Sequence, residues 1–214
     1  MSEIKITWFG HAMFLFENPN LKLITDPFDE QVGYPVPELE ADVVLVSHEH
    51  FDHNNVSLLK GTYQVIKETS PVDINNVKIE GCPSFHDDAQ GKKRGTNIIF
   101  KWNMSGVTIA HMGDYGESQL SRQQKEFLKG LDVLLLPVGG VYTINGQKAW
   151  EFVEELKPRI VIPMHYKTEH CKIPIKGIED FLKNATDIKH FPSSVTISAS
   201  MLPVKTEIWQ LASA

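Results

Sequence analysis

The chain has 214 residues, of which 42% are hydrophobic and 22% charged, a balance typical of a globular protein. No apolar run approaches the roughly 20 residues that a membrane-spanning helix needs, and no basic segment followed by an apolar one opens the chain. The formal net charge of −6 gives no positive footprint for nucleic acid. We therefore expect a cytoplasmic protein without a membrane partner, with nucleic acid disfavoured and a homo-oligomer left open.

The chain has only two cysteines, Cys82 and Cys171, and neither belongs to a Cys-x-x-Cys pair. In a protein without an export signal, we expect two reduced thiols rather than a disulfide. Neither cysteine is a good candidate for a metal ligand.

Short strands are predicted along most of the chain. Residues 4–8 alternate in polarity, and residues 13–16 and 22–25 are mostly apolar. Residues 28–40 are rich in proline, glycine and acidic side chains and are expected to form a loop. Residues 43–46 form a continuous apolar run, as in strands buried on both faces. Further strands are predicted at 77–79, 97–102, 107–110, 133–136, 160–162, 195–198 and 204–211.

Helical periodicity appears in residues 118–129, 147–156 and 178–182, and each of the first two segments precedes a short apolar strand. Strand-rich halves with interspersed helices predict two sheets packed face to face, with helices on the outside. No linker or low-complexity segment divides the chain, so residues 1–214 are expected to form a single domain.

The segment after the apolar run carries four side chains of metal-ligand type in six positions: His48, His50, Asp52 and His53. In an extended segment, residues two apart point the same way, so His48 and His50 can converge on one ion. Asp52 and His53 follow where the chain must turn and are better placed to reach a second ion. Imidazole and carboxylate are ordinary ligands of zinc and similar ions. A solvated polar loop is the alternative, but this density of ligands favours a metal site.

This segment resembles the His-x-His-x-Asp-His motif of the metallo-β-lactamase-fold superfamily. Further along, His86, Asp114 and His165 look like its next metal histidine, its bridging aspartate and its final histidine. The resemblance implies an α/β (α+β) fold arranged as a four-layer αββα sandwich, and a binuclear metal site. It assigns the ligands to two ions: His48, His50 and His86 to one, Asp52, His53 and His165 to the other, and Asp114 to both. One tetrahedral zinc uses about four ligands, so seven candidate ligands also suggest more than one ion.

Segments 8–12, 25–28, 136–143 and 163–166 resemble the compact bacterial and archaeal hydrolases related to L-ascorbate-6-phosphate lactonase. In that group the histidine equivalent to His11 lies close to the metals, which implies that His11 contacts a ligand or the substrate. The alternative is that His11 only fixes a strand end. His111 precedes Asp114 by three residues, so on a strand the two would point to opposite faces, and His111 is expected to support a ligand or to pack rather than to bind the metal directly. The remaining histidines, His170 and His190, are expected at the surface.

Three features near the expected site each allow two interpretations. Tyr142 is a candidate to project its hydroxyl into a substrate pocket. The pair Gly139-Gly140 permits close approach of a ligand to the backbone, or simply turns the chain. The run Lys92-Lys93-Arg94 attracts an anionic substrate group such as phosphate, or is a solvated loop.

Two divalent ions, zinc first and manganese or iron as alternatives, imply hydrolysis by a metal-activated water. Asp52 would orient the water or return a proton to the leaving group. A small-molecule lactone or ester, phosphorylated or not, is the expected substrate. A phosphodiesterase acting on nucleotides or nucleic acid is the alternative, and a non-enzymatic metal-binding module is the second alternative. His50 stands where flavo-diiron oxidoreductases have glutamate, and Asp114 where secreted β-lactamases commonly have cysteine, which argues against both groups.

Overall fold

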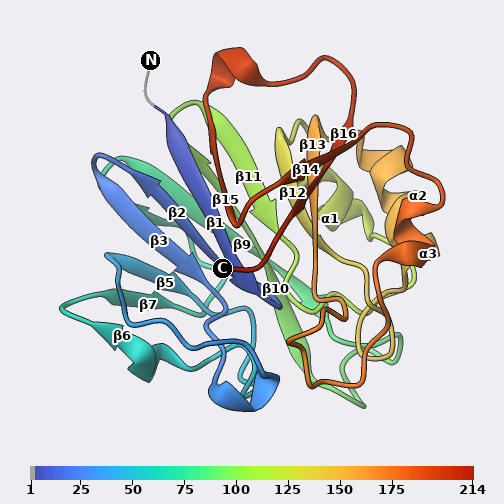
Figure 1. Cartoon of the computed structure of the whole chain (residues 1–214), viewed down its shortest axis with the longest axis horizontal. Helices are drawn as coiled ribbons and strands as arrows, with labels where there is room; N and C mark the ends of the chain where they lie inside the picture. The colour runs from blue at the N-terminus through green and yellow to red at the C-terminus, as the bar shows by residue number, and fades with distance from the viewer. Residues whose placement is uncertain (1–2) are drawn as a thin grey trace.

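Two large β-sheets form the centre of the computed structural model, which describes residues 3–214 (Figure 1). The six-stranded sheet has the order β15-β1-β2-β3-β5-β7. Its strands are β1 (Ile4–Gly10), β2 (Met13–Asn18), β3 (Leu21–Thr25), β5 (Val43–Leu45), β7 (Gln64–Ile66) and β15 (Ser194–Ile197). A separate pair is formed by β4 (Leu39–Glu40) and β6 (Leu59–Lys60).

The eight-stranded sheet has the order β14-β16-β13-β12-β11-β10-β9-β8. Its strands are β8 (Val72–Ile74), β9 (Val77–Phe85), β10 (Thr96–Met104), β11 (Val107–His111), β12 (Val133–Pro137), β13 (Ile160–Met164), β14 (Ile188–Phe191) and β16 (Glu207–Leu211). The helices are α1 (Arg122–Phe127), α2 (Gly146–Leu156) and α3 (Glu179–Leu182), with short 3-10 helices η1 (Glu30–Val32), η2 (Val56–Leu58) and η3 (Ala199–Met201).

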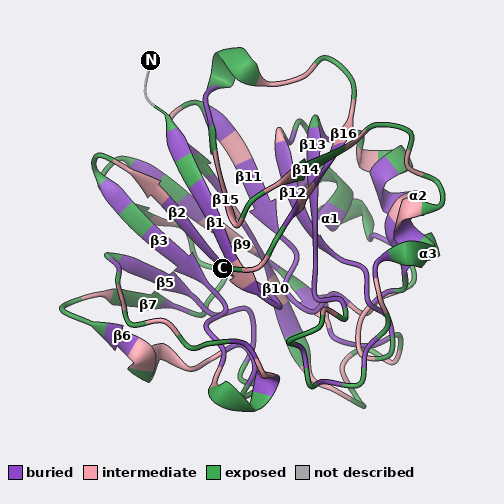
Figure 2. Ribbon diagram, viewed as in Figure 1, coloured by how far each residue is buried: buried purple, intermediate pink, exposed green. Residues whose placement is uncertain are grey.

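Apolar side chains from both sheets meet in one core. Strand β2 shows how the alternation of a strand produces this packing: Phe14 and Phe16 enter the core between the sheets, whereas Met13 and Leu15 face the opposite side. Phe16 meets Trp102 of β10 edge to face, with ring centroids 4.9 Å apart. Figure 2 shows that the central strands are buried along most of their length. The sheets are therefore joined by aromatic packing across their facing surfaces.

The outer layers of the two sheets differ. Helices α1, α2 and α3 lie together on the side of the eight-stranded sheet (Figure 1), and α2 packs on α3 through Trp150 and Phe181. The outer face of the six-stranded sheet is covered by 3-10 turns and loops, which contribute Phe28, Val32 and Tyr34 to a second apolar cluster. The expected two-sheet α/β architecture is confirmed, but this fourth layer is not α-helical. Prolines at positions 27, 35 and 37 prevent a continuous helix there.

Strand direction gathers the carboxyl ends of many strands at one edge. β3, β5 and β7 run parallel to one another, and so do β11, β12 and β13. β1 is antiparallel to β2, which is antiparallel to β3, so β1 and β3 point the same way. By the same reasoning through β10, strand β9 points the same way as β11. The segments that follow these strands therefore meet at the same end of the molecule.

Most predicted elements are present, and the differences have local causes. The helix predicted at 118–129 is shorter because Ser121 caps α1 in a capping box with Gln124. The strand predicted at 77–79 continues as β9 to Phe85 despite Pro83. β8 pairs only with residues 77–79, so Pro83 lies on an edge where its missing N–H leaves no partner unpaired. The short strands β4, β6, β7, β8 and β14 were not predicted. Within residues 3–214, no helix combines the length and apolar character needed to span a bilayer.

We expect Phe16→Ala to lower the free energy of unfolding by about 3–5 kcal/mol, because it opens a cavity between the sheets against Trp102. Urea denaturation followed by circular dichroism measures the loss. Val204→Ala is the control at a residue that is 97% exposed, and it should change the free energy by less than about 0.5 kcal/mol. Equal losses in the two variants would show that the sheets do not depend on this contact.

Candidate metal centre

Each residue predicted as a metal ligand lies just beyond a strand at the shared edge. His48 to His53 follow β5, His86 follows β9 directly, Asp114 comes three residues after β11, and His165 follows β13 directly. His11 follows β1 in the same way. Because these strands point the same way, the seven predicted ligands and His11 are brought together, as the sequence pattern suggested.

The carboxylate of Asp114 lies at the centre of this cluster. Its oxygens are 3.1 Å from Nε2 of both His86 and His165, and 3.2 Å from Nε2 of His53. Nε2 of His48 is 3.9 Å away. Asp114 is 1% exposed, so this carboxylate is removed from water and surrounded by imidazoles.

The side chains divide into groups whose ligand atoms lie within 4.8 Å of one another. These groups are His48, His50 and His86; His11, Asp52, His53 and His165; and His48, His53 and Asp114. The first two correspond to the two ligand sets predicted from sequence, with His11 added to the second. Asp114 lies between them and contacts histidines of both.

Buried polar atoms without a hydrogen-bond partner test whether this cluster suits a cation. Nine such side-chain atoms occur in the described part of the chain, and seven belong to the cluster. They are Nδ1 of His11, Nε2 of His48, Nε2 of His53, Nδ1 of His86, both ring nitrogens of His165 and Oδ1 of Asp114. The nitrogens of His53 and His165 lie close to Asp114, yet their orientation does not make hydrogen bonds. Four of these atoms lie close to one another around Asp114, namely its Oδ1 and Nε2 of His48, His53 and His165, and their lone pairs fit divalent ions.

The charge states of three members of the cluster also suit cation binding, whereas Asp114 and Asp52 raise the pKa of His53 although burial opposes them, so that His53 releases a proton when it binds an ion. Burial, together with nearby His53, lowers the pKa of His48 to about 3. Burial and the neighbouring His165 lower the pKa of His11 to about 4. Burial alone would raise the pKa of Asp114, but His165 and His53 outweigh it and hold that pKa well below its ordinary value. Neutral imidazole and ionised carboxylate are the forms that bind metals.

A second buried carboxylate, Asp26, orients two of the histidines. Its Oδ2 accepts hydrogen bonds from Nδ1 of His53 (2.9 Å) and from the Ser47 hydroxyl (2.7 Å), and its Oδ1 accepts from the Ser47 amide (2.7 Å). Since the hydroxyl proton is directed to Asp26, the Ser47 oxygen accepts from Nδ1 of His48 at 2.9 Å. Both histidines thus carry their proton on Nδ1 and present Nε2 to the cluster.

His11 and Asp52 form a contact that the sequence did not specify. Nε2 of His11 lies 3.1 Å from Oδ2 of Asp52, and the His11 ring lies on that of His165 with centroids 4.0 Å apart. The backbone amide of His165 also donates to the carbonyl of His11. His11 and His165 both have a φ of 51°, a left-handed conformation that is uncommon for histidine. His11 therefore does more than end a strand, because it contacts a predicted ligand directly.

His111 supports the site without joining any ligand group. Its Nε2 donates to the carbonyl of Ala12 at 2.9 Å, and its Nδ1 accepts from the amide of Gly113 at 3.1 Å.

Gly139 also has a structural role, since a Cβ there would lie 2.2 Å from the carbonyl oxygen of His165. The group that approaches this glycine closely is the chain after β13, and the interpretation that a ligand approaches it stays a prediction. His170 and His190 are exposed, as expected.

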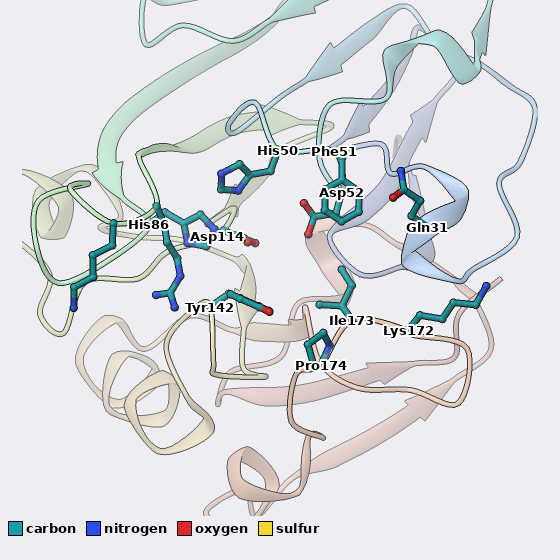
Figure 3. Close-up of a pocket in the computed structure, with 12 residues that line it drawn as sticks. Gln31, His50, Phe51, Asp52, His86, Asp114, Tyr142, Lys172, Ile173 and Pro174 are labelled. Carbon is teal, nitrogen blue, oxygen red and sulfur yellow. Dashed lines mark ion pairs between the residues drawn. The ribbon is translucent and has the colours of Figure 1, made fainter.

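A cavity of about 540 Å³ opens above the cluster. His50, Asp52, His86 and Asp114 line it, and Figure 3 shows Tyr142 below them. The cavity is also lined by Gln31, Phe51, Lys93, Arg94, Lys172, Ile173 and Pro174. Tyr142 and two members of the predicted basic run therefore face the same space as the ligands, whereas Lys92 does not line it.

Sequence reasoning missed the role of Asp26. Two signals pointed to it without assigning a role: the aspartate lies directly after a strand, and segment 25–28 is one of those that resemble the compact hydrolases. The arrangement of Asp52 with His11 likewise depends on residues 41 positions apart, which no local spacing reveals.

Comparison with known proteins agrees with this geometry. The family model of the beta-lactamase superfamily domain matches residues 5–165. A UPF0173 metal-dependent hydrolase of Archaeoglobus fulgidus is 33% identical, over 84% of this chain and 90% of the relative. Another, from Thermococcus kodakarensis, is 32% identical, over 77% of this chain and 85% of the relative.

Solved structures agree as well. A Thermotoga maritima protein, assigned to the metallo-beta-lactamase superfamily as a candidate Zn-dependent hydrolase, has a TM-score of 0.81 and 36% identity, over 97% of this chain and 98% of the other. A metallo-beta-lactamase fold protein from Bacillus subtilis has a TM-score of 0.66 and 15% identity, over 100% and 98% of the two chains. The second likeness supports the fold alone.

Asp26→Asn is expected to weaken metal binding by about ten- to hundredfold, because an amide has one acceptor oxygen in place of two and cannot accept all three hydrogen bonds that His53 and Ser47 donate. Titration against a chelating indicator measures the affinity for Zn²⁺. Asp73→Asn, at an exposed residue of β8, is the matched control and should bind Zn²⁺ like the unchanged protein. An Asp26→Asn variant with unchanged affinity would mean that Asp26 does not orient the histidines.

Proposed function

The chain belongs to the beta-lactamase superfamily and is a metal-dependent hydrolase, and from that premise we propose that it cleaves a small-molecule lactone or ester using two divalent ions. The observation that carries the proposal is the position of Asp114. Its carboxylate lies between two groups of predicted ligands, and most of these side chains have a buried ring nitrogen without a hydrogen-bond partner. A carboxylate between two ligand sets can be shared by two ions held a few ångströms apart, which supports a pair of ions.

In this proposal, one ion is held by His48, His50 and His86, the other by Asp52, His53 and His165, and Asp114 is shared. Zinc is the ion we expect first, because imidazole and carboxylate sets of this kind suit it. The likeness to the candidate Zn-dependent hydrolase of Thermotoga maritima supports the same choice. Manganese and iron are the alternatives, since they accept the same ligands.

Divalent ions at such a site supply an acidified water and a Lewis acid for the substrate's carbonyl oxygen. Hydrolysis adds the hydroxyl of water to the acyl carbon, breaks the acyl C–O bond and places a proton on the departing oxygen. Asp52 is suited to move that proton, because its carboxylate lines the cavity while His11 holds Oδ2 at 3.1 Å. The contact with His11 orients the Asp52 carboxylate through Oδ2 and leaves Oδ1 available to exchange a proton.

The cavity favours a small substrate. Its volume of about 540 Å³ lies within the usual range of small-molecule pockets. Phe51, Ile173 and Pro174 give it an apolar side, and Figure 3 shows them gathered near Asp52 and Tyr142. The two buried cysteines, Cys82 and Cys171, lie outside the lining, so the proposed chemistry uses no thiol nucleophile.

We expect Asp114→Ala to lower kcat/KM for lactone or ester cleavage by more than about a hundredfold, because both ligand sets lose their shared carboxylate. Zinc-loaded protein is assayed against a panel of lactones, esters and bis-para-nitrophenyl phosphate, and bound metal is measured by mass spectrometry. Asp73→Ala is the control with an exposed carboxylate.

Unchanged activity and metal content in Asp114→Ala would rule out the shared-carboxylate site. Turnover of bis-para-nitrophenyl phosphate without cleavage of any lactone or ester would replace the proposed substrate class with phosphodiesters.

A further inference from the structure

We propose that Arg94 binds a carboxylate or phosphate group of the substrate, so that the lactone or ester cleaved at this centre is an anion. The inference rests on the proposed function, since it uses the same cavity, and it adds the charge of the substrate. Its basis is a guanidinium that two loops hold at the wall of the cavity, and residues 3–214 provide no acidic partner for it.

The first loop, residues 87–95, follows the predicted ligand His86 and is organised around a buried carboxylate. Asp87 accepts four backbone hydrogen bonds within it, from the amides of Ala89, Gly91, Lys93 and Arg94, at 2.7 to 3.0 Å. These bonds hold the pKa of Asp87 below its ordinary value, although burial opposes them. The Asp87 carboxylate therefore binds the backbone of its own loop. Because the Arg94 amide is one of the four donors, the main chain at Arg94 is held in place.

The second loop, residues 139–142, holds the guanidinium itself. Nη2 of Arg94 donates to the carbonyl of Val141 at 3.1 Å, and Cζ lies 5.4 Å from the centroid of the Tyr142 ring. A guanidinium over an aromatic face is attracted to it and loses little freedom when it binds a planar anion.

The backbone at Val141 is strained in a way that positions both contacts. Val141 has a φ of 66°, and the amide of Tyr142 donates to the carbonyl of Gly140 at 2.8 Å, which closes a γ-turn. A β-branched residue in this region is an outlier, and such outliers cluster at ligand sites. The turn directs the Val141 carbonyl to Arg94 and places the Tyr142 ring under it.

The guanidinium has unused binding capacity. Within residues 3–214, Arg94 makes no ion pair, and neither do Lys93 and Lys172, which also line the cavity. Only one of the five N–H groups of Arg94 has a partner in this part of the chain. Guanidinium pairs with carboxylate and phosphate through two parallel hydrogen bonds. Lys93 and Lys172, both exposed, increase the local attraction for anions in a chain whose net charge is −6.

Two esters with the same leaving group test this directly: mono-4-nitrophenyl succinate, which is an anion, and 4-nitrophenyl butyrate, which is neutral. Zinc-loaded protein is expected to prefer the anionic ester, measured as the ratio of the two kcat/KM values. Arg94→Gln should reduce that ratio by about ten- to hundredfold. Arg94→Lys should reduce it by less, because lysine keeps the positive charge but not the paired N–H donors of the guanidinium. Arg122→Gln, at an exposed arginine of α1, is the control and should keep the ratio.

Anion binding is measured separately, by calorimetric titration of the zinc-loaded proteins with succinate and with inorganic phosphate. Arg94→Gln should lower the affinity for the preferred anion by about tenfold or more. The anion whose affinity falls distinguishes a carboxylate site from a phosphate site. If neither ester is hydrolysed but Arg94→Gln weakens anion binding, the ester proposal fails and the anion site stands. If the ester ratio and both affinities are the same with and without Arg94, the anion site is contradicted even where esters are cleaved.

Discussion

A buried carboxylate surrounded by imidazoles that do not hydrogen-bond to it is the constraint on which this molecule depends. Asp114 lies within 4 Å of Nε2 atoms from four histidines, and most ligand atoms around it have no partner. Each unsatisfied buried polar group costs about 1–3 kcal/mol. The cluster therefore reduces the stability of the apolar core, and two packed sheets of apolar side chains offset this cost.

The scaffold holds this cluster by placing every predicted ligand at the same end of similarly directed strands. Local strain is concentrated at that end, where His11, Asp26, Val141 and His165 all have left-handed backbone conformations. Asp26 then fixes the protonated nitrogen of two histidines at once, directly for His53 and through Ser47 for His48. Strain and buried polar groups of this kind reduce stability but hold side chains in one geometry before an ion or a substrate arrives.

The sequence predicted the strands around the site because their apolar runs are continuous. It predicted the clustering of the candidate ligands because four of them fall within six positions, and because His86, Asp114 and His165 resemble the later residues of a family motif. It did not predict the layer outside the six-stranded sheet, since turns and loops have no periodicity. The continuation of β9 through Pro83 was missed because proline is tolerated only where the neighbouring strand has ended, which is a tertiary property. Asp26 and the contact of Arg94 with Tyr142 join segments distant in sequence, so only the fold reveals them.

The most direct test of this account is the crystal structure of the zinc-loaded protein, with anomalous diffraction recorded on both sides of the zinc absorption edge. The account predicts two zinc ions about 3.5–4 Å apart, each held by one of the two ligand groups and both contacting Asp114. A single ion at full occupancy, or two ions of which only one contacts Asp114, would contradict it.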